Sequence, residues 1–396
     1  MTAFGGGAVV SGVGQSEVGR ALNRSGLALT LDACLEAIAD AGLDVADVDG
    51  LATYPGADNI GPGFGGAGAT EVIDALGLRV NWYLGACETS GQLGPVVAAC
   101  MAVATGMARH VVCFRTVTES SAQRGRGRAG TLEDTGRGQR KVARHWGEWS
   151  LPYGAYPPSL FGMHAQRYMS VYGLRREQLA QVALNARTNA ALNPKAVYRD
   201  PLDLDAYLDA RMISTPFCLY DCDVPVDGST AVVVSAAATR ADRPRPPLTV
   251  EAVGAALRSR YTFDQDIERP AVYDAGEALW KHTSLTPADV DVAELYDGFS
   301  FFTLTWLEAL GFCKPGEAGD FVDGGKRIAI GGELPLNTQG GQLSGGRLHG
   351  LGMLHEACEQ LWQRGGARQV PGDPKVAVAS AGGGPFAGCV LLARET

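Results

Sequence analysis

The segment from Leu336 to Gly352 combines glycines with polar side chains in a pattern that suits the binding of an anionic group. Donor side chains occur at Asn337, Arg347 and His349, and glycines stand at 340, 341, 345, 346 and 350. Glycine permits positive φ angles and a close approach of the backbone to a ligand. An apolar helical run follows at 351–361, and the N-terminus of a helix stabilises an anion or a developing oxyanion. The alternative is a long loop in which glycine only separates elements.

Two further polar turns follow runs that we expect to be strands. Glu294-Leu-Tyr-Asp-Gly-Phe299 follows the run 290–293, and Ser380-Ala-Gly-Gly-Gly-Pro385 follows the run 376–379. We also expect a strand at 326–330, ahead of the glycine-rich segment. In stacked α/β folds, the carboxyl ends of strands converge on one crevice. The sequence therefore predicts one site that is built from three turns.

The composition describes a globular chain of ordinary polarity. The 396 residues include 46% hydrophobic and 19% charged residues, enough for a sizeable core and two domain-sized units. The net charge of −9 argues against a nucleic-acid surface. We find no apolar run near the roughly 18 residues of a membrane span and no secretory signal. The nine cysteines form no paired Cys-x-x-Cys framework, so we predict a reduced, cytoplasmic protein without a metal site.

A Pro-rich, charged segment from Arg240 to Pro247 is the best linker in the chain. It separates a predicted N-terminal unit, 1–243, with a loop region at about 116–200, from a C-terminal unit, 248–396. Both units show the order strand, helix, strand, helix, strand. We therefore predict an internal duplication at the level of the fold, without visible sequence identity.

Four motifs follow one another along the chain. They are Val226-Asp-Gly-Ser-Thr-Ala231, the turn Glu294–Phe299, Asn337-Thr-Gln-Gly-Gly-Gln342 and Ser380-Ala-Gly-Gly-Gly384. In this order and spacing they resemble the thiolase superfamily, in particular its lipid-transfer-protein (sterol carrier) branch, and the resemblance covers nearly the whole chain. It implies an α/β thiolase fold that is duplicated into five layers, α-β-α-β-α, is usually dimeric, and acts on acyl-CoA thioesters without a covalently bound cofactor.

The departures from the thiolase pattern argue against thiolysis. The nucleophilic cysteine of a thiolase aligns with Glu88, beside Cys87, and its second cysteine aligns with Ser380. Its basic histidine aligns with Arg347, while His349 follows two residues later. Acyl transfer to CoA needs a thiolate and a base that generates it. Arginine remains protonated and cannot be that base.

The chain is similar to one subgroup of this branch, the thiolase-fold aldolases of steroid side-chain degradation. These carry a tyrosine in a Tyr-Asp-x-Phe turn, which Tyr296–Phe299 matches, and their second tyrosine aligns with Arg347. The resemblance implies retro-aldol cleavage of a β-hydroxyacyl-CoA to a ketone or aldehyde and a shortened acyl-CoA. It also implies a small partner subunit with an OB-fold and a zinc-ribbon-like part.

Tyr296 is the leading candidate for the acid–base group. A free phenol, with a pKa of about 10, is a poor base at neutral pH, and a nearby guanidinium would favour the phenolate. We therefore hypothesise that Arg347 stabilises ionised Tyr296 or binds the enolate oxygen. His349, Glu88 and Cys87 are further catalytic candidates. The alternative for Tyr296 is a packed tyrosine with a satisfied hydroxyl.

The remaining candidates are expected to bind substrate. Asp297 either orients Tyr296 or caps the next helix. The glycine triplet either offers a backbone N–H to the thioester oxygen or forms a tight turn. The aromatic residues from Trp146 to Phe161 either line an apolar substrate pocket or pack together in a small separate core under the loop. The expected substrate-binding residues are Asp297, Asn337, Gly340, Gly341, Ser380, Gly382 and Gly383.

Two other functions remain open on the sequence alone. Cys87 as nucleophile, with His349 as base, would give a thiolase or acyltransferase. A chain without catalytic activity would bind acyl-CoA or lipid.

Overall fold

The computed structural model of the chain describes residues 3–56, 62–85, 91–123, 151–155, 157–242, 244–258 and 269–394. In these ranges nine strands form one mixed sheet in the order β3-β2-β4-β7-β1-β8-β11-β10-β9. The first-half elements are β1 (Ala8–Gln15), α1 (Gly26–Asp40), β2 (Gly50–Thr53), α2 (Ala69–Leu76), β3 (Trp82–Gly85), α3 (Gly94–Ala104), β4 (His110–Thr118), α4 (Glu119–Ala122), α7 (Pro157–Tyr172), α8 (Arg176–Ala190), α9 (Leu204–Leu208), β5 (Met212–Ser214), β6 (Phe217–Cys218) and β7 (Asp227–Ala236).

The second half follows the order of the first, except that its described residues contain no strand at the place of β3. Its elements are β8 (Leu248–Leu257), α10 (Ala271–Trp280), β9 (Val292–Glu294), α11 (Ser300–Ala309), α12 (Ala318–Val322), a π-helical turn (Gly341–Gly345), α13 (His349–Leu361), β10 (Val376–Gly382) and β11 (Phe386–Arg394). The half-sheets join where β1 and β8 pair through Val9–Thr249 and Val10–Leu248. The unit boundaries 1–243 and 248–396 stay predictions.

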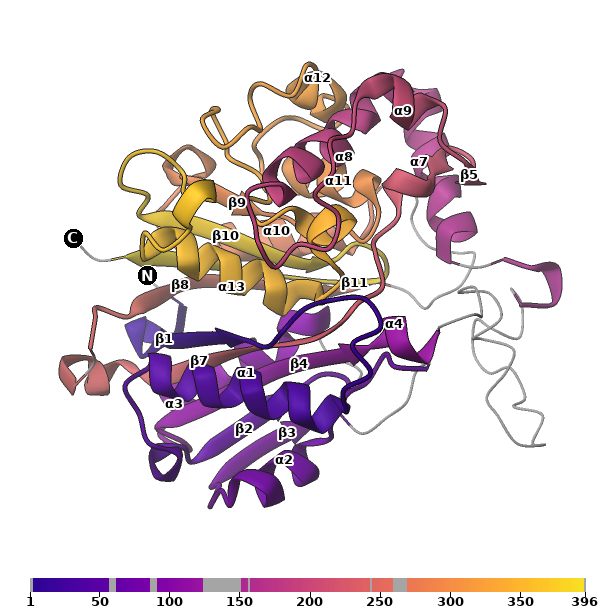
Figure 1. Cartoon of the computed structure of the whole chain (residues 1–396). Coiled ribbons are helices and arrows are strands. Elements are labelled where there is room, and N and C mark those ends of the chain that lie inside the picture. Colours follow the sequence, from indigo (N-terminus) through magenta and orange to yellow (C-terminus); the bar gives the residue numbers. More distant parts are fainter. Residues whose placement is uncertain are drawn as a thin grey trace.

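The helices lie in three layers around the two half-sheets. Alternate residues of β4 face different cores: Val111 and Cys113 pack in the core with α3, and Val112 and Phe114 in the core with α1. Figure 1 shows α13 between β10 above it and β1 and β7 below it. On the outer side of the second half-sheet, α10 packs on β8 and β11. This arrangement confirms the expected duplicated five-layered α/β fold.

One short sequence match accompanies the duplication. Ala46-Asp-Val-Asp49 precedes β2 and Ala288-Asp-Val-Asp291 precedes β9. Asp49 accepts the backbone N–H groups of Arg109 and His110 at the start of β4. Asp291 does the same for the residues at the start of β10. Each aspartate therefore ties one strand to its parallel neighbour at the same place in its half.

Close contacts between strand and helix repeat as well. Both β1 and β8 have a register shift, which leaves Ser11 and Glu251 without a paired residue opposite. Three residues later, Gly14 lies under α1 and Gly254 under α10. A Cβ atom at Gly254 would lie 1.9 Å from the carbonyl oxygen of Ala275. Glycine is therefore required where each helix crosses its first strand.

The expected strand at 326–330 is wrong. Residues 326–330 form turns, although the Ile328 side chain is fully buried. Gly324 and Gly325 before this run adopt positive φ angles, which end the preceding helix and prevent an extended approach. The strands expected near 290–293 and 376–379 are present as β9 and β10, and α13 contains the expected helix.

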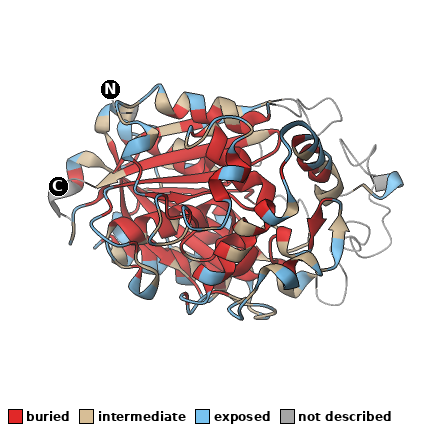
Figure 2. Cartoon of the chain, turned by 90° about the horizontal axis from the view of Figure 1, so that it is seen from above, coloured by how far each residue is buried: buried red, intermediate tan, exposed pale blue. Residues whose placement is uncertain are grey.

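Figure 2 shows that buried residues fill the strands and the centre of the molecule, while exposed residues lie on the outer helices and turns. Among the residues that the structure describes, no helix is both long and apolar enough to span a bilayer.

Candidate functional site

The three predicted turns meet at the carboxyl ends of β9 and β10. Asn337 clamps the backbone of Leu295: its Oδ1 accepts the Leu295 N–H at 2.7 Å, and its Nδ2 donates to the Leu295 carbonyl at 2.9 Å. The Ser380 hydroxyl accepts the backbone N–H of Tyr296 at 2.9 Å. The turn that carries Tyr296 is therefore held from both sides by residues that we expected to bind substrate.

Tyr296 and His349 come together at this junction. The Tyr296 hydroxyl lies 3.3 Å from Nδ1 of His349, and both side chains are buried. His349 is the first residue of α13 and adopts a φ of +60°, which is uncommon for a residue other than glycine. Its backbone N–H donates to Oε1 of Gln342. Strained backbone of this kind persists where the surroundings fix it, often at functional sites.

Asp297 supports the glycine-rich segment and does not cap α11. Its Oδ1 accepts the backbone N–H of Gln342 at 2.8 Å. The N-cap residue of α11 is Phe299, and no side-chain hydrogen bond caps this helix. The carboxyl group is fully buried, and this burial raises the pKa of Asp297 to about 7. The group is therefore protonated far more readily near neutral pH than an ordinary aspartate, and such a shifted carboxyl group lies beside a candidate catalytic pair.

Arg347 binds two carboxylates of the first half. Its guanidinium forms ion pairs with Glu119, at the start of α4, and with Asp223, where Nη1 lies 3.4 Å from Oδ2. All three side chains are buried. Arg347 therefore joins the two halves next to the site. The hypothesis that it stabilises ionised Tyr296 or binds the enolate oxygen stays a prediction.

Helix α8 holds the backbone of the glycine-rich segment through asparagines that the sequence reasoning missed. Asn185 and Asn189 both donate to the carbonyl oxygen of Leu336, and Asn189 also reaches that of Asn337. Asn193, just beyond the helix, donates to Gln339. Spacings of four residues place such side chains on one helix face. This polar stripe on a buried helix is the signal that would have revealed them.

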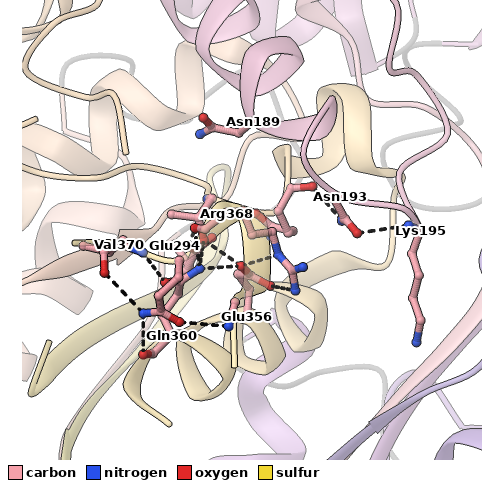
Figure 3. Close-up of polar contacts among 12 residues, drawn as sticks. Asn189, Asn193, Lys195, Glu294, Glu356, Gln360, Arg368 and Val370 are labelled. Carbon is pink, nitrogen blue, oxygen red and sulfur yellow. Dashed lines mark hydrogen bonds and ion pairs between the residues drawn. The ribbon is translucent and has the colours of Figure 1, made fainter. Parts of the chain in front are cut away.

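A buried acidic pair supports the same segment from below (Figure 3). The Thr338 hydroxyl lies within 2.8 Å of carboxylate oxygens of both Glu294 and Glu356, and Arg368 binds Glu356 with two nitrogens. Burial, together with the charge of Glu356, raises the pKa of Glu294 well above its usual range. Burial also opposes ionisation of Glu356, but Arg368 outweighs it and keeps the pKa of Glu356 low. One charge and one neutral acid therefore share this site.

The glycines that we singled out pack closely against neighbouring groups. A Cβ atom at Gly340 would lie 2.6 Å from the Ala190 side chain, and one at Gly341 would lie 1.9 Å from Oδ2 of Asp297. Both have positive φ angles. The carbonyl of Gly382 accepts the indole N–H of Trp306, and Gly383 lies against the Phe302 ring.

An aromatic wall lies beside Tyr296. Phe161 of α7 packs on Phe302 with ring centroids 4.7 Å apart, and Phe302 lies 6.3 Å from the Tyr296 ring. Phe299 contacts both phenylalanines. Of the expected aromatic loop, Phe161 is therefore at the site and Tyr153 is exposed, whereas Trp146, Trp149 and Tyr156 lie outside the described residues.

Cys87 and Glu88 also lie outside the described residues, at 86–90. Within the described part of the chain, no group of three or more His, Cys, Asp or Glu side chains could hold a metal ion. A small solvent-open pocket reaches the loop at Gln339, Gln342 and His349.

Comparisons with known proteins identify the family of the chain. Residues 254–392 match the family described as Thiolase C-terminal domain-like. A steroid side-chain-cleaving aldolase of Thermomonospora curvata is 37% identical, over 99% of this chain and 99% of that protein. A 17-hydroxy-3-oxo-4-pregnene-20-carboxyl-CoA lyase of Mycobacterium tuberculosis is 36% identical, over 97% and 98%. A solved structure described as the Ltp2-ChsH2(DUF35) aldolase has a TM-score of 0.84 and 34% identity, over 98% of each chain.

These relatives are matched along nearly their whole length, and the solved one shares the fold. The chain therefore belongs to the thiolase superfamily, in the sterol-carrier branch that includes the steroid side-chain-cleaving aldolases.

Proposed function

We propose that the chain catalyses retro-aldol cleavage of a β-hydroxyacyl-CoA of the steroid side-chain type. The observation that carries the proposal is the contact between the Tyr296 hydroxyl and Nδ1 of His349. This pair supplies a phenol and a base at the meeting point of three turns. Two whole-length relatives are named as an aldolase and a lyase of this kind.

The proposed reaction begins with proton transfer. His349 accepts the phenolic proton at Nδ1, which is an acceptor when the ring proton is on Nε2. The phenolate of Tyr296 then removes the proton of the substrate's β-hydroxyl group. As the carbonyl bond forms, the bond between the α- and β-carbons breaks, and its electron pair passes into the thioester enolate. A proton returned to the α-carbon gives the shortened acyl-CoA, and the other product is a ketone or aldehyde.

The distance of 3.3 Å is longer than an ordinary O–H···N hydrogen bond, as is common before substrate binds. Burial of both side chains excludes water, so a charge that develops here interacts more strongly with nearby groups than it would in solvent. Arg347 has a supporting role, because Glu119 and Asp223 already bind its guanidinium.

The surroundings of Tyr296 favour an apolar group next to the scissile bond. Phe161, Phe299 and Phe302 form a wall at the tyrosine ring. A sterol ring system attached to the β-carbon would bury its surface there, with a gain of about 25 cal/mol per Å². The coenzyme A thioester is the other part of the substrate, and no covalent cofactor is required.

We also propose a partner subunit, a homodimer and a cytoplasmic location. The solved aldolase at 34% identity is described as a complex with a DUF35 protein. This supports a small partner of the OB-fold and zinc-ribbon type for the present chain.

The test is an incubation of the chain with a branched β-hydroxyacyl-CoA and, separately, with a β-ketoacyl-CoA plus free CoA, each with and without a small DUF35-type protein. Mass spectrometry of the first reaction should show a ketone or aldehyde and a shortened acyl-CoA, without added CoA. Cleavage of only the β-ketoacyl substrate, dependent on free CoA, would identify a thiolase that uses Cys87. Tight acyl-CoA binding with neither product would identify a binding protein.

A further inference from the structure

A buried arginine on β4 faces the same crevice as Tyr296 and His349. Arg115 is fully buried, and its Nη1 donates to the carbonyl oxygen of Thr116 at 2.7 Å. Alternate residues of a strand point to opposite faces. Thr116 bonds Thr30 of α1 on the outer face, so Arg115 points inward, like Val117, which packs on Leu348. The guanidinium therefore belongs to the interior layer that contains the site.

The guanidinium stacks on aromatic rings that lead to His349. Its central carbon lies 4.6 Å from the centroid of the Phe64 ring and 5.6 Å from that of Tyr54. The Phe64 ring in turn lies 5.2 Å from the His349 ring, at an interplanar angle of 69°. Arg115, Phe64, His349 and Tyr296 thus form a continuous series of contacts between the two halves. Attraction between a cation and a ring is strongest where water is excluded.

The loop that carries Phe64 is fixed against β4. Gly63 accepts the backbone N–H of Thr118 at 2.8 Å. A Cβ atom at Gly63 would lie 2.5 Å from the Thr118 carbonyl oxygen, and one at Gly66 would lie 2.4 Å from the Thr116 side chain. Because the loop lies this close to the strand, Phe64 has little freedom between Arg115 and His349. The imidazole is therefore confined between Phe64 and the Tyr296 hydroxyl.

The charge of Arg115 acts on His349 in addition to the packing. The two distances share the Phe64 centroid, so the guanidinium carbon lies within about 10 Å of the imidazole centre. A buried cation at this range disfavours an imidazolium and favours the neutral ring. Among the residues that the structure describes, the other charged or titratable groups near His349 include Tyr296 and Asp297 after β9, Arg347 with its partners Glu119 and Asp223, and Lys195 across the pocket.

We propose that Arg115 is a positioning residue that acts through Phe64, holding His349 against Tyr296 and keeping the imidazole neutral. This rests on the proposed function of the Tyr296–His349 pair. Stacking and charge are separable, because Arg115→Met removes both, Arg115→Lys keeps the charge without the planar fork, and Phe64→Leu keeps the charge without the ring.

The experiment measures kcat, KM and the pH profile of kcat/KM for the three variants of the full chain with its partner protein. In Arg115→Met, kcat should fall about tenfold. The acid limb of the kcat/KM profile should also move to higher pH by roughly one unit, because His349 becomes protonated more readily. Arg115→Lys should keep the acid limb of the original chain, and Phe64→Leu should lower kcat without moving the limb. A merely structural role would lower activity without shifting the limb, so an unmoved limb in Arg115→Met would overturn the proposal.

A ¹⁵N-histidine NMR titration of His349 gives the same information without turnover. The midpoint should rise in Arg115→Met and stay in place in Phe64→Leu. If Tyr296→Phe keeps full activity, the proposed function fails, yet this titration still decides the role of Arg115. If Arg115→Met does not fold, Arg115→Gln, which also removes the charge, decides: an acid limb at higher pH than in the original chain supports the proposal, and an unmoved limb overturns it.

Discussion

The hydroxyl of Tyr296 meets Nδ1 of His349 at 3.3 Å, although these residues come from separate turns. The tyrosine follows β9, and the histidine begins α13. Asn337 and Ser380 fix the tyrosine's backbone, and Gln342 receives the backbone N–H of the histidine. The contact therefore depends on the whole arrangement of the three turns.

Removal of either member of this pair should abolish most of the activity. We expect Tyr296→Phe and His349→Gln each to lower kcat/KM by 10² to 10⁴, the usual range for a general acid–base group. The double variant should lose little more than either single one, because groups that act as a unit are not additive. Steady-state kinetics with a β-hydroxyacyl-CoA measures this. Matched controls are Tyr83→Phe and His282→Gln at exposed positions, and a loss below tenfold in Tyr296→Phe would contradict the assignment.

Asp297 should make the protein less stable as the pH rises. Burial raises the pKa of its carboxyl group to about 7, whereas the unfolded chain ionises near 3.8. Below pH 4 both states are protonated. Between pH 4 and 7 only the unfolded state ionises, so the native state loses stability, by up to about 4 kcal/mol.

The measurement is the free energy of unfolding in urea between pH 4 and pH 8. Asp297→Asn, which keeps an acceptor for the Gln342 N–H, should flatten the decline over pH 4 to 7. An identical pH dependence in the variant and the original chain would show that Asp297 is not the group concerned.

The ion pairs of Arg347 should be costly to break. Arg347→Met leaves Glu119 and Asp223 buried without their cation, and we expect a loss of about 3–5 kcal/mol in unfolding free energy. Adding Glu119→Gln and Asp223→Asn should recover most of this loss, since none of the three positions then carries a buried charge. The exposed pair Arg175–Asp323 is the matched control. Arg175→Met should cost no more than about 1 kcal/mol. An equal loss at both arginines would contradict the expected difference between the buried and the exposed ion pairs.

Asn189 should affect catalysis without touching substrate. Asn189→Leu removes one donor from each of the carbonyls of Leu336 and Asn337, which keep the donors Asn185 and Gly340, and the loss of these two hydrogen bonds should cost about 1–3 kcal/mol. The displaced loop should lower kcat about 10- to 100-fold, because small misplacements near reacting groups are costly. Thermal unfolding and kinetics measure both effects. Thr188→Ala, at the exposed neighbouring position on α8, should leave both unchanged; an unaltered kcat in Asn189→Leu would argue against the positioning role.

Much of the architecture was accessible from the sequence because regular elements have periodic patterns. Alternation and helical spacing located β9, β10 and α13, and four glycine-rich motifs indicated the thiolase fold. The predicted strand at 326–330 was wrong, because an apolar residue such as Ile328 can be buried equally well in a turn. The matching Ala-Asp-Val-Asp runs became meaningful only when Asp49 and Asp291 were seen at equivalent strand starts.

The sequence by itself determined the family and the three converging turns and made Tyr296 the leading catalytic candidate, because these depend on residue types at fixed local spacings. Only the tertiary structure decided that His349 contacts the tyrosine and that Arg347 pairs with Glu119 and Asp223. The two residues are two positions apart on irregular backbone, where Gly346 has a φ of 124° and His349 one of 60°. Spacing along such backbone does not determine where a side chain points. The contributions of Asn189, Arg115 and Phe64 come from distant segments, and only packing brings these to the site.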